Sequence, residues 1–213
     1  SIPGNQHVVL DAGQAEPALA KALKLAVNRE DLLLQGLNGQ GHIGHDSPVG
    51  PFNQYYEMSG ARYDPAEAKA LLRPSGFAPI GLGLLSLSAV PENLARALWP
   101  SLSAVGFVKG NDSQVKLRLS SGRATEDWAF ANIGPDQGTI AGVRAQARAE
   151  LDPAKRAALY ADLQSQFRNE SAVVIPAFAN FLQAMTTRLV SPTLIGNLWP
   201  MDNARFAERW WMS

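Results

Sequence analysis

The chain has 213 residues, with 19 basic and 19 acidic side chains, so its formal net charge is zero. This balance excludes the extended basic surface that is typical of nucleic-acid-binding proteins. The absence of cysteine excludes disulfides, thiolate metal sites and a thiol nucleophile. A hydrophobic fraction of 46% suffices for a packed core, and no apolar run is long enough to span a bilayer.

Helix and strand patterns alternate along the first third of the chain. Residues 6–11 predict a short strand, and residues 17–36 predict a helix with its apolar positions on one face. A loop rich in Gly, Pro, Asn and His follows over residues 36–56, and loops of this length are usually functional or disordered. Asp64 is the expected N-cap of the next helix, with Glu67 placed as the acid of a capping box.

The middle of the chain continues this alternation. Residues 80–88 predict a buried strand, and residues 91–105 predict a helix. Pro100 removes a backbone hydrogen bond inside that helix, so we expect a kink there or two shorter helices. Further elements are expected beyond it: strands at residues 115–119 and 127–132, and a helix at residues 139–150.

The clearest local signal surrounds Asp152. Its carboxylate can accept the free N–H groups of a first helical turn, and Pro153 occupies the position where a missing N–H costs nothing. An apolar stripe at a spacing of four then follows: Leu159, Leu163 and Phe167. The pattern next becomes β-branched and predicts two strands joined by a turn near Asn180. Strands alternating with helices indicate an α/β fold.

Four segments in the same order resemble a known family. They read Ala-Leu-Lys-Leu-Ala-Val-Asn-Arg-Glu at residues 22–30, Tyr-Asp-Pro-Ala-Glu-Ala-Lys-Ala-Leu-Leu at 63–72 followed by Gly-Phe at 76–77, Asp-Pro-Ala-Lys-Arg at 152–156 leading to Val-Val-Ile-Pro at 173–176, and Asn-Ala-Arg-Phe-Ala-Glu-Arg-Trp-Trp at 203–211. The family is the dipeptide/oligopeptide type (family 5) of extracellular solute-binding proteins, the capture components of ABC importers.

The resemblance implies one lobe of a two-lobed, type II-like periplasmic binding protein, with a mixed sheet flanked by helices. Relatives carry a whole lobe ahead of this region. Residues 1–213 are therefore expected to be a single C-terminal lobe, a fragment of a longer protein. Residues 190–213 are expected to pack toward the missing N-terminal lobe.

The segment Asp-Trp-Ala-Phe-Ala-Asn-Ile-Gly-Pro-Asp at residues 127–136 resembles the cleft-lining segment of that family. The expected ligand-binding residues are Trp128, Phe130, Asn132, Asp136, Ile43 and His45. In peptide-binding relatives an aspartate three residues after the tryptophan pairs with the ligand's α-ammonium, and Ala131 stands there in this chain. A free-amine peptide should then bind poorly by this lobe alone, unless Asp136 or the missing lobe substitutes. The alternative for Trp128 and Phe130 is a place in a buried strand.

Other chemistries find weaker support. Residues 39–44 fit the pattern GxGxxG, but a helix precedes them and prolines follow, which favours a turn over a dinucleotide site. His42, His45 and Asp46 could approach a metal ion, although a loop spacing of three does not fix the geometry that such sites need. We therefore expect no metal and no cofactor. No pair of nucleophile and base is visible, so we expect no enzymatic activity.

The resemblance implies the substrate-binding component of an ABC importer in the periplasm or another extracytoplasmic compartment. It would capture a peptide or other small polar solute between two lobes and deliver it to the permease subunits. The alternative is a non-transport protein-interaction domain derived from a binding-protein lobe. Three tryptophans lie near the C-terminus, at positions 199, 210 and 211. They are expected to cover the seam between the lobes, and an exposed seam would permit dimerisation.

Overall fold

The computed structural model describes residues 2–13, 15–58, 60–72, 80–86, 92–109, 115–123, 139–196 and 200–213. The helices are α1 (Pro17–Ala26), α2 (Arg29–Asp31), the π-helical turn η1 (Leu32–Gly36), α3 (Pro65–Leu72), α4 (Glu92–Ala104), α6 (Thr139–Ala149), α7 (Pro153–Glu170), α8 (Pro200–Ala204) and α9 (Phe206–Arg209). The strands are β1 (Ile2–Asp11), β2 (Gly41–Ile43), β3 (Ile80–Ser86), β4 (Phe107–Lys109), β5 (Val115–Arg123), β6 (Val173–Phe181), β7 (Leu189–Val190) and β8 (Trp211–Met212). Within these ranges no helix has the length and apolar character of a membrane span.

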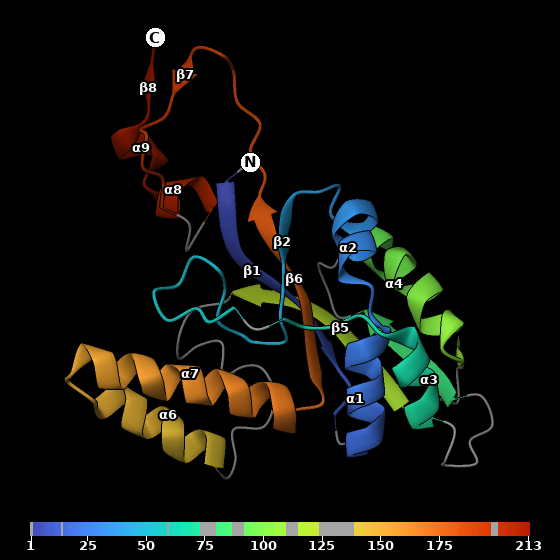
Figure 1. The fold of residues 1–213 in the computed structure, drawn as a ribbon. Coiled ribbons are helices and arrows are strands. Elements are labelled where there is room, and N and C mark those ends of the chain that lie inside the picture. The colour runs from blue at the N-terminus through green and yellow to red at the C-terminus, as the bar shows by residue number, and fades with distance from the viewer. Residues whose placement is uncertain are drawn as a thin grey trace.

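Six strands form one mixed sheet in the order β2-β6-β1-β5-β3-β4 (Figure 1). The pairs β2–β6, β6–β1 and β1–β5 are antiparallel, whereas β3 runs parallel to both β5 and β4. The expected mixed sheet flanked by helices is therefore confirmed.

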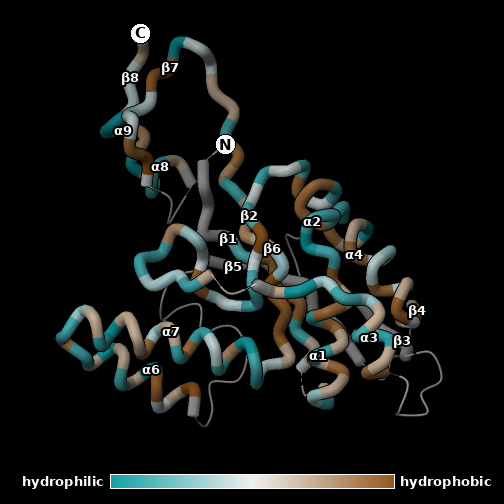
Figure 2. The backbone as a smooth tube through the Cα atoms, viewed as in Figure 1, coloured by the Kyte–Doolittle hydropathy of each residue, from teal (hydrophilic) through white to brown (hydrophobic). Residues whose placement is uncertain are grey.

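Helices cover both faces of this sheet. Because side chains alternate along a strand, Val8 and Leu10 of β1 join the core beneath α1, α3 and α4. Val9 joins the opposite core with Leu163 and Phe167 of α7. Figure 2 shows hydrophobic segments along β6, between the two helical layers. The chain thus forms three layers, with the sheet between two layers of helices.

The two N-caps predicted from the sequence, Asp152 and Asp64, are confirmed. The Asp152 carboxylate accepts hydrogen bonds from the N–H groups of Ala154 (2.8 Å) and Lys155 (3.1 Å) at the start of α7. The Asp64 carboxylate accepts the N–H of Glu67 (2.8 Å) beside α3. Of the two alternatives expected at Pro100, the division into two shorter helices is wrong, because α4 runs as one helix from Glu92 to Ala104 with Pro100 inside it.

Two expectations about element boundaries are wrong. The helix expected over residues 17–36 is interrupted after α1, because Asn28 leaves the helical conformation and its side chain accepts the N–H of Asp31. The turn expected near Asn180 is absent. Strand β6 continues there because Ala179 pairs with both Gln6 of β1 and Gly41 of β2. The strand expected at residues 127–132 lies outside the described residues.

A C-terminal arm, residues 182–196 and 200–213, extends beyond the end of the sheet near the N-terminus (Figure 1). Its short strands β7 and β8 pair with each other, and Trp210 is buried within the arm, where its Nε1 donates to Asp202 (3.3 Å). Trp211 is 53% exposed, whereas Trp199 lies outside the described residues. The arm also exposes apolar side chains at Leu182, Met185, Leu194, Phe206 and Met212. Packing of residues 190–213 against a second lobe stays a prediction.

A buried ion pair joins the start of α2 to the loop after β2. The Arg29 guanidinium lies 2.6 Å from the Asp46 carboxylate, and both side chains are almost fully buried. The second carboxylate oxygen accepts the N–H of Ile175 in β6 (3.0 Å). Nearby, the Lys24 ammonium donates to the carbonyl oxygens of Arg168 and Ser171 at the C-terminal end of α7, and burial lowers the pKa of Lys24. These polar contacts join α1, α2, α7 and β6.

We expect Asp46→Asn to lower the free energy of unfolding by about 3–5 kcal/mol, because it leaves a buried guanidinium without its counter-charge. Asparagine tolerates the positive φ of this position (56°), so the loss of stability is due to the missing charge and not to backbone strain. Urea denaturation followed by circular dichroism measures it. The control is Glu92→Ala, which removes the exposed pair with Arg96 and should cost at most about 1 kcal/mol. Equal losses in the two variants would contradict a structural role for the buried pair.

Candidate ligand-binding site

The strand registers place a row of residues across one end of the sheet. Gln6 of β1 lies opposite Arg123 of β5 and also opposite Ala179 of β6, which in turn faces Gly41 of β2. The next row, one residue along each strand, contains Gly122, His7, Phe178 and His42. Directly opposed side chains share a face of a sheet. His7, Phe178 and His42 therefore lie on the face that α6 and α7 cover farther along.

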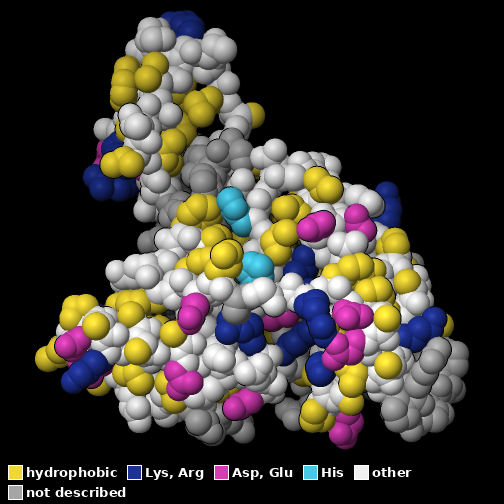
Figure 3. All heavy atoms as spheres, in the orientation of Figure 1, with side chains coloured by type: hydrophobic (Ala, Val, Ile, Leu, Met, Phe, Trp, Pro, Cys, Tyr) yellow, Lys and Arg dark blue, Asp and Glu magenta, His cyan; other side chains and the backbone are white. Residues whose placement is uncertain are grey.

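Burial differs along this aromatic row. His7 is only 4% exposed and Phe178 is fully buried, whereas His42 is partly exposed on the edge strand. The ring of His42 meets that of Phe52 edge to face, with the centroids 4.9 Å apart and the planes at 79°. Phe52 is 41% exposed. On the face drawn in Figure 3, histidine side chains lie beside hydrophobic ones.

The three glycines of residues 39–44 have separate structural causes. Gly39 has a φ of 71°, a conformation that glycine adopts without a steric penalty. A Cβ at Gly41 would lie 2.5 Å from the carbonyl oxygen of Phe178, and one at Gly44 would overlap the carbonyl oxygen of Ile175. The pattern GxGxxG thus reflects a turn followed by close packing of the chain against β6.

The metal arrangement considered for His42, His45 and Asp46 does not form. Both oxygens of Asp46 are engaged by Arg29 and the Ile175 N–H. The Nδ1 atom of His45 accepts the N–H of Ala61 (3.2 Å), and burial lowers the pKa of His45. Among the residues that the structure describes, no group of three possible metal ligands occurs.

The predicted ligand-binding residues are only partly placed. Ile43 pairs with Ala177 and lies on the opposite face of the sheet from its neighbour His42. His45 follows the end of β2 and is half-buried. The other four, Trp128, Phe130, Asn132 and Asp136, lie outside the described residues. They follow β5 in sequence, whose last residue, Arg123, belongs to the first row described above.

Phe52 is a candidate residue that the sequence did not single out. It lies in a loop of Gly, Pro, Asn and Gln that also carries Tyr55 and Tyr56, and a cluster of aromatic side chains among such residues is a signal that could have identified it. Its partner His42 was considered only as a metal ligand. The contact between them brings together one edge strand and the loop that follows it.

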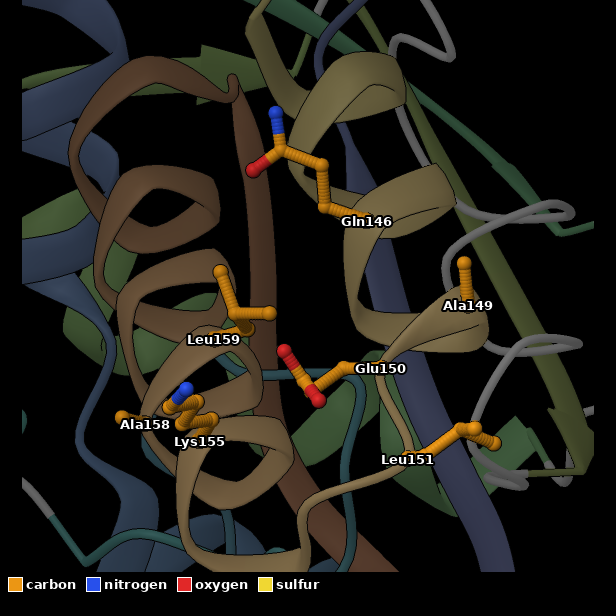
Figure 4. A pocket seen from close by; sticks show the side chains of 7 residues that line it. All are labelled: Gln146, Ala149, Glu150, Leu151, Lys155, Ala158 and Leu159. Carbon is orange, nitrogen blue, oxygen red and sulfur yellow. The ribbon is translucent and has the colours of Figure 1, made fainter.

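An open groove lies elsewhere, between α6 and α7 (Figure 4). This open groove has a volume of about 820 Å³. The residues that line it are Gln146, Ala149, Glu150, Leu151, Lys155, Ala158 and Leu159. None of them belongs to the aromatic row or to the loop that carries Phe52, so the groove is separate from the candidate site.

Comparison with solved structures identifies the fold. A dipeptide-binding protein from Pseudoalteromonas sp. SM9913, in complex with Met-Leu, matches with a TM-score of 0.75 and 15% identity over 91% of this chain and 46% of its own. AgaA from A. tumefaciens R10, in complex with agropinic acid, matches with a TM-score of 0.73 and 16% identity; the match covers 99% of this chain and 51% of AgaA. NikA from Staphylococcus aureus, in complex with Ni(L-His)2, matches with a TM-score of 0.70 and 15% identity; the match covers 83% of this chain and 45% of NikA.

These structures are solute-binding proteins, and this chain spans about half their length. The chain therefore has the fold of one lobe of a two-lobed periplasmic binding protein, as the sequence resemblance implied. No protein-family model matches the sequence, and comparison with curated proteins gives no match. The similarity to the solved structures therefore establishes a shared fold.

The buried His7 predicts a pH dependence of stability. Burial lowers its pKa from 6.5 to about 3 in the folded protein, whereas the unfolded chain takes up a proton near pH 6.5. The stability that neutral His7 contributes is therefore fully present above pH 6.5 and is lost as the pH falls toward 3. Between pH 7 and pH 5 the free energy of unfolding should fall by about 2 kcal/mol from this group.

Urea denaturation at a series of pH values tests this dependence. In His7→Phe the fall between pH 7 and pH 5 should shrink, and the partly exposed His42 provides the matched control variant, His42→Phe, which should retain it. Half-buried His45 contributes in the same direction, so the comparison uses the difference between the variants. Parallel curves for wild type and His7→Phe would contradict the assignment.

Proposed function

We propose that this chain is part of the substrate-binding component of an ABC importer. The observation that carries the proposal is the fold: most of the chain superposes on about half of several solute-binding proteins, with TM-scores of 0.70 to 0.75. The aromatic end of the sheet supplies a surface on which a solute could rest. The complete protein would hold the solute between this lobe and a second one.

Such a protein works by closing around its ligand. A solute that contacts both lobes binds the closed form better than the open form, and only this difference in affinity shifts the population toward closure. A permease that recognises the closed form would then receive a loaded protein. We place this cycle in the periplasm or another extracytoplasmic compartment, where the importers of this type collect their solutes.

The solute we propose is a peptide or another small polar molecule. Trp128 would form an apolar wall, with Asn132 and Asp136 as polar contacts and the loop around Phe52 closing one end. The proteins with a similar fold were solved with Met-Leu, with agropinic acid and with Ni(L-His)2, so the fold accommodates several chemical classes. Ala131 argues against strong recognition of an N-terminal amine, because no carboxylate stands at that position to pair with it.

A thermal-shift screen tests the proposed function. The natural full-length product that contains these residues is screened against dipeptides, opines, sugars and nickel–histidine. A solute that binds only the native state must raise the melting temperature. We expect a rise that saturates with concentration for one of these classes. No rise with any of them, together with copurification of a protein partner, would favour the alternative of a protein-interaction domain.

Restoring a carboxylate at position 131 tests the role proposed for the 127–136 segment. We expect Ala131→Asp to tighten binding of Met-Leu by tenfold or more, equivalent to about 1.4 kcal/mol, because a carboxylate would pair with the α-ammonium. Isothermal titration calorimetry of both proteins measures the change. N-acetyl-Met-Leu, which lacks the ammonium group, is the matched control ligand and should gain nothing. Equal gains for the two ligands, or none for either, would contradict the placement of this segment in the cleft.

A further inference from the structure

Gln164 is a polar residue fully buried in the middle of α7. It follows Leu163, which belongs to a core cluster of apolar and aromatic side chains. A buried amide is costly unless its donors and acceptor are satisfied. The loop between β2 and α3 provides its partners.

The Gln164 amide holds both limbs of that loop. On the first limb, the Ser47 hydroxyl donates to Oε1 of Gln164 (3.0 Å). On the second limb, the Glu57 N–H donates to the same oxygen (3.2 Å), and Nε2 of Gln164 donates to the carbonyl oxygen of Tyr55 (2.7 Å). A single side chain therefore ties two segments that lie eight to ten residues apart in sequence.

Apolar contacts support the same attachment. The ring of Tyr55 stacks on that of Tyr160, one helical turn before Gln164, with the centroids 4.5 Å apart and the planes at 20°. Val49 is buried in the core that contains Leu163 and Phe167. The loop tip between the two limbs carries Phe52, which is exposed and meets His42 edge to face.

We propose that Gln164 is a positioning residue of the ligand-binding site. By fixing both limbs of residues 47–57 to α7, it holds Phe52 against His42 at the aromatic end of the sheet before any solute arrives. A preorganised contact surface does not pay the ordering cost of the loop on binding. The inference rests on the proposed function in one respect, namely that this loop closes one end of the solute cleft.

The first experiment needs no ligand. Gln164→Met preserves the length of the side chain but removes its hydrogen bonds, and Phe52→Leu removes the aromatic ring that faces His42. In NMR spectra, the ring-proton resonances of His42 should move in Gln164→Met by more than half of the way toward their positions in Phe52→Leu. Backbone amides of residues 47–57 should exchange with deuterium faster in the same variant.

A matched control lies on the same helix. Half-buried Gln166 donates from its Nε2 to the exposed Asp162 carboxylate one turn earlier on α7 (2.8 Å). It makes no hydrogen bond with the loop of residues 47–57 that the structure describes, so Gln166→Met should leave the His42 resonances and the loop exchange rates unchanged. Unchanged His42 resonances in Gln164→Met, in a protein that is still folded by circular dichroism, would overturn the positioning role. A change of equal size in Gln166→Met would overturn it as well, because the effect would then be a general loosening of α7.

The second experiment measures binding of Met-Leu to the natural full-length protein well below its melting temperature. We expect Gln164→Met to raise the Kd about tenfold or more while Gln166→Met leaves it unchanged. Unchanged affinity in Gln164→Met would overturn the link between the loop and the ligand. If Met-Leu does not bind the wild type, the choice of ligand class under the proposed function fails, and the NMR comparison still decides the positioning role by itself.

Discussion

The carboxylate of Asp46 is the constraint on which the site depends. One oxygen receives the Arg29 guanidinium and the other receives the N–H of Ile175. Arg29 in turn donates to the carbonyl oxygens of Lys24 and Val27, where α1 ends. A buried charge of this kind is stable only when its partners satisfy it, and loss of either partner leaves the other uncompensated. The first limb of the loop, the end of α1 and the middle of β6 are therefore fixed together.

Strand β6 transmits this constraint to the candidate site. Pro176 has no N–H to donate, but its carbonyl oxygen accepts the N–H of Gly44 (2.8 Å), so the chain beyond β2 stays attached to β6. Toward its C-terminal end the same strand pairs with β1 on one side and β2 on the other. His42 and His7 consequently share a row with Phe178. The position of His42 is thus set by backbone pairing, and that of Phe52 by the attachment of its loop to α7.

Sequence reasoning succeeded where the cause is local. Asp152 and Pro153 start α7 through contacts within three residues, so the helix could be placed from the sequence. The turn expected near Asn180 failed because the N–H of that residue bonds to Gln40, far away in the chain. The role of Gln164 was hidden for the same reason, since its loop partners are more than one hundred residues distant. The segment that contains Trp128 was found only through a family resemblance, and its place in the cleft stays a prediction.

The chemistry of the described site favours recognition of shape over recognition of charge. Two ionic groups close to the loop are engaged internally: Asp46 with Arg29, and Lys24 with the carbonyl oxygens at the end of α7. Among the side chains that the structure describes, His42 and Phe52 form an accessible aromatic corner, which offers apolar area and a ring edge. Such a surface accommodates many side chains and discriminates weakly among them. Under the proposed function, selectivity for a charged solute would then come from the segment after β5 or from an opposing lobe. The proteins of similar fold were solved with ligands as different as Met-Leu, agropinic acid and Ni(L-His)2.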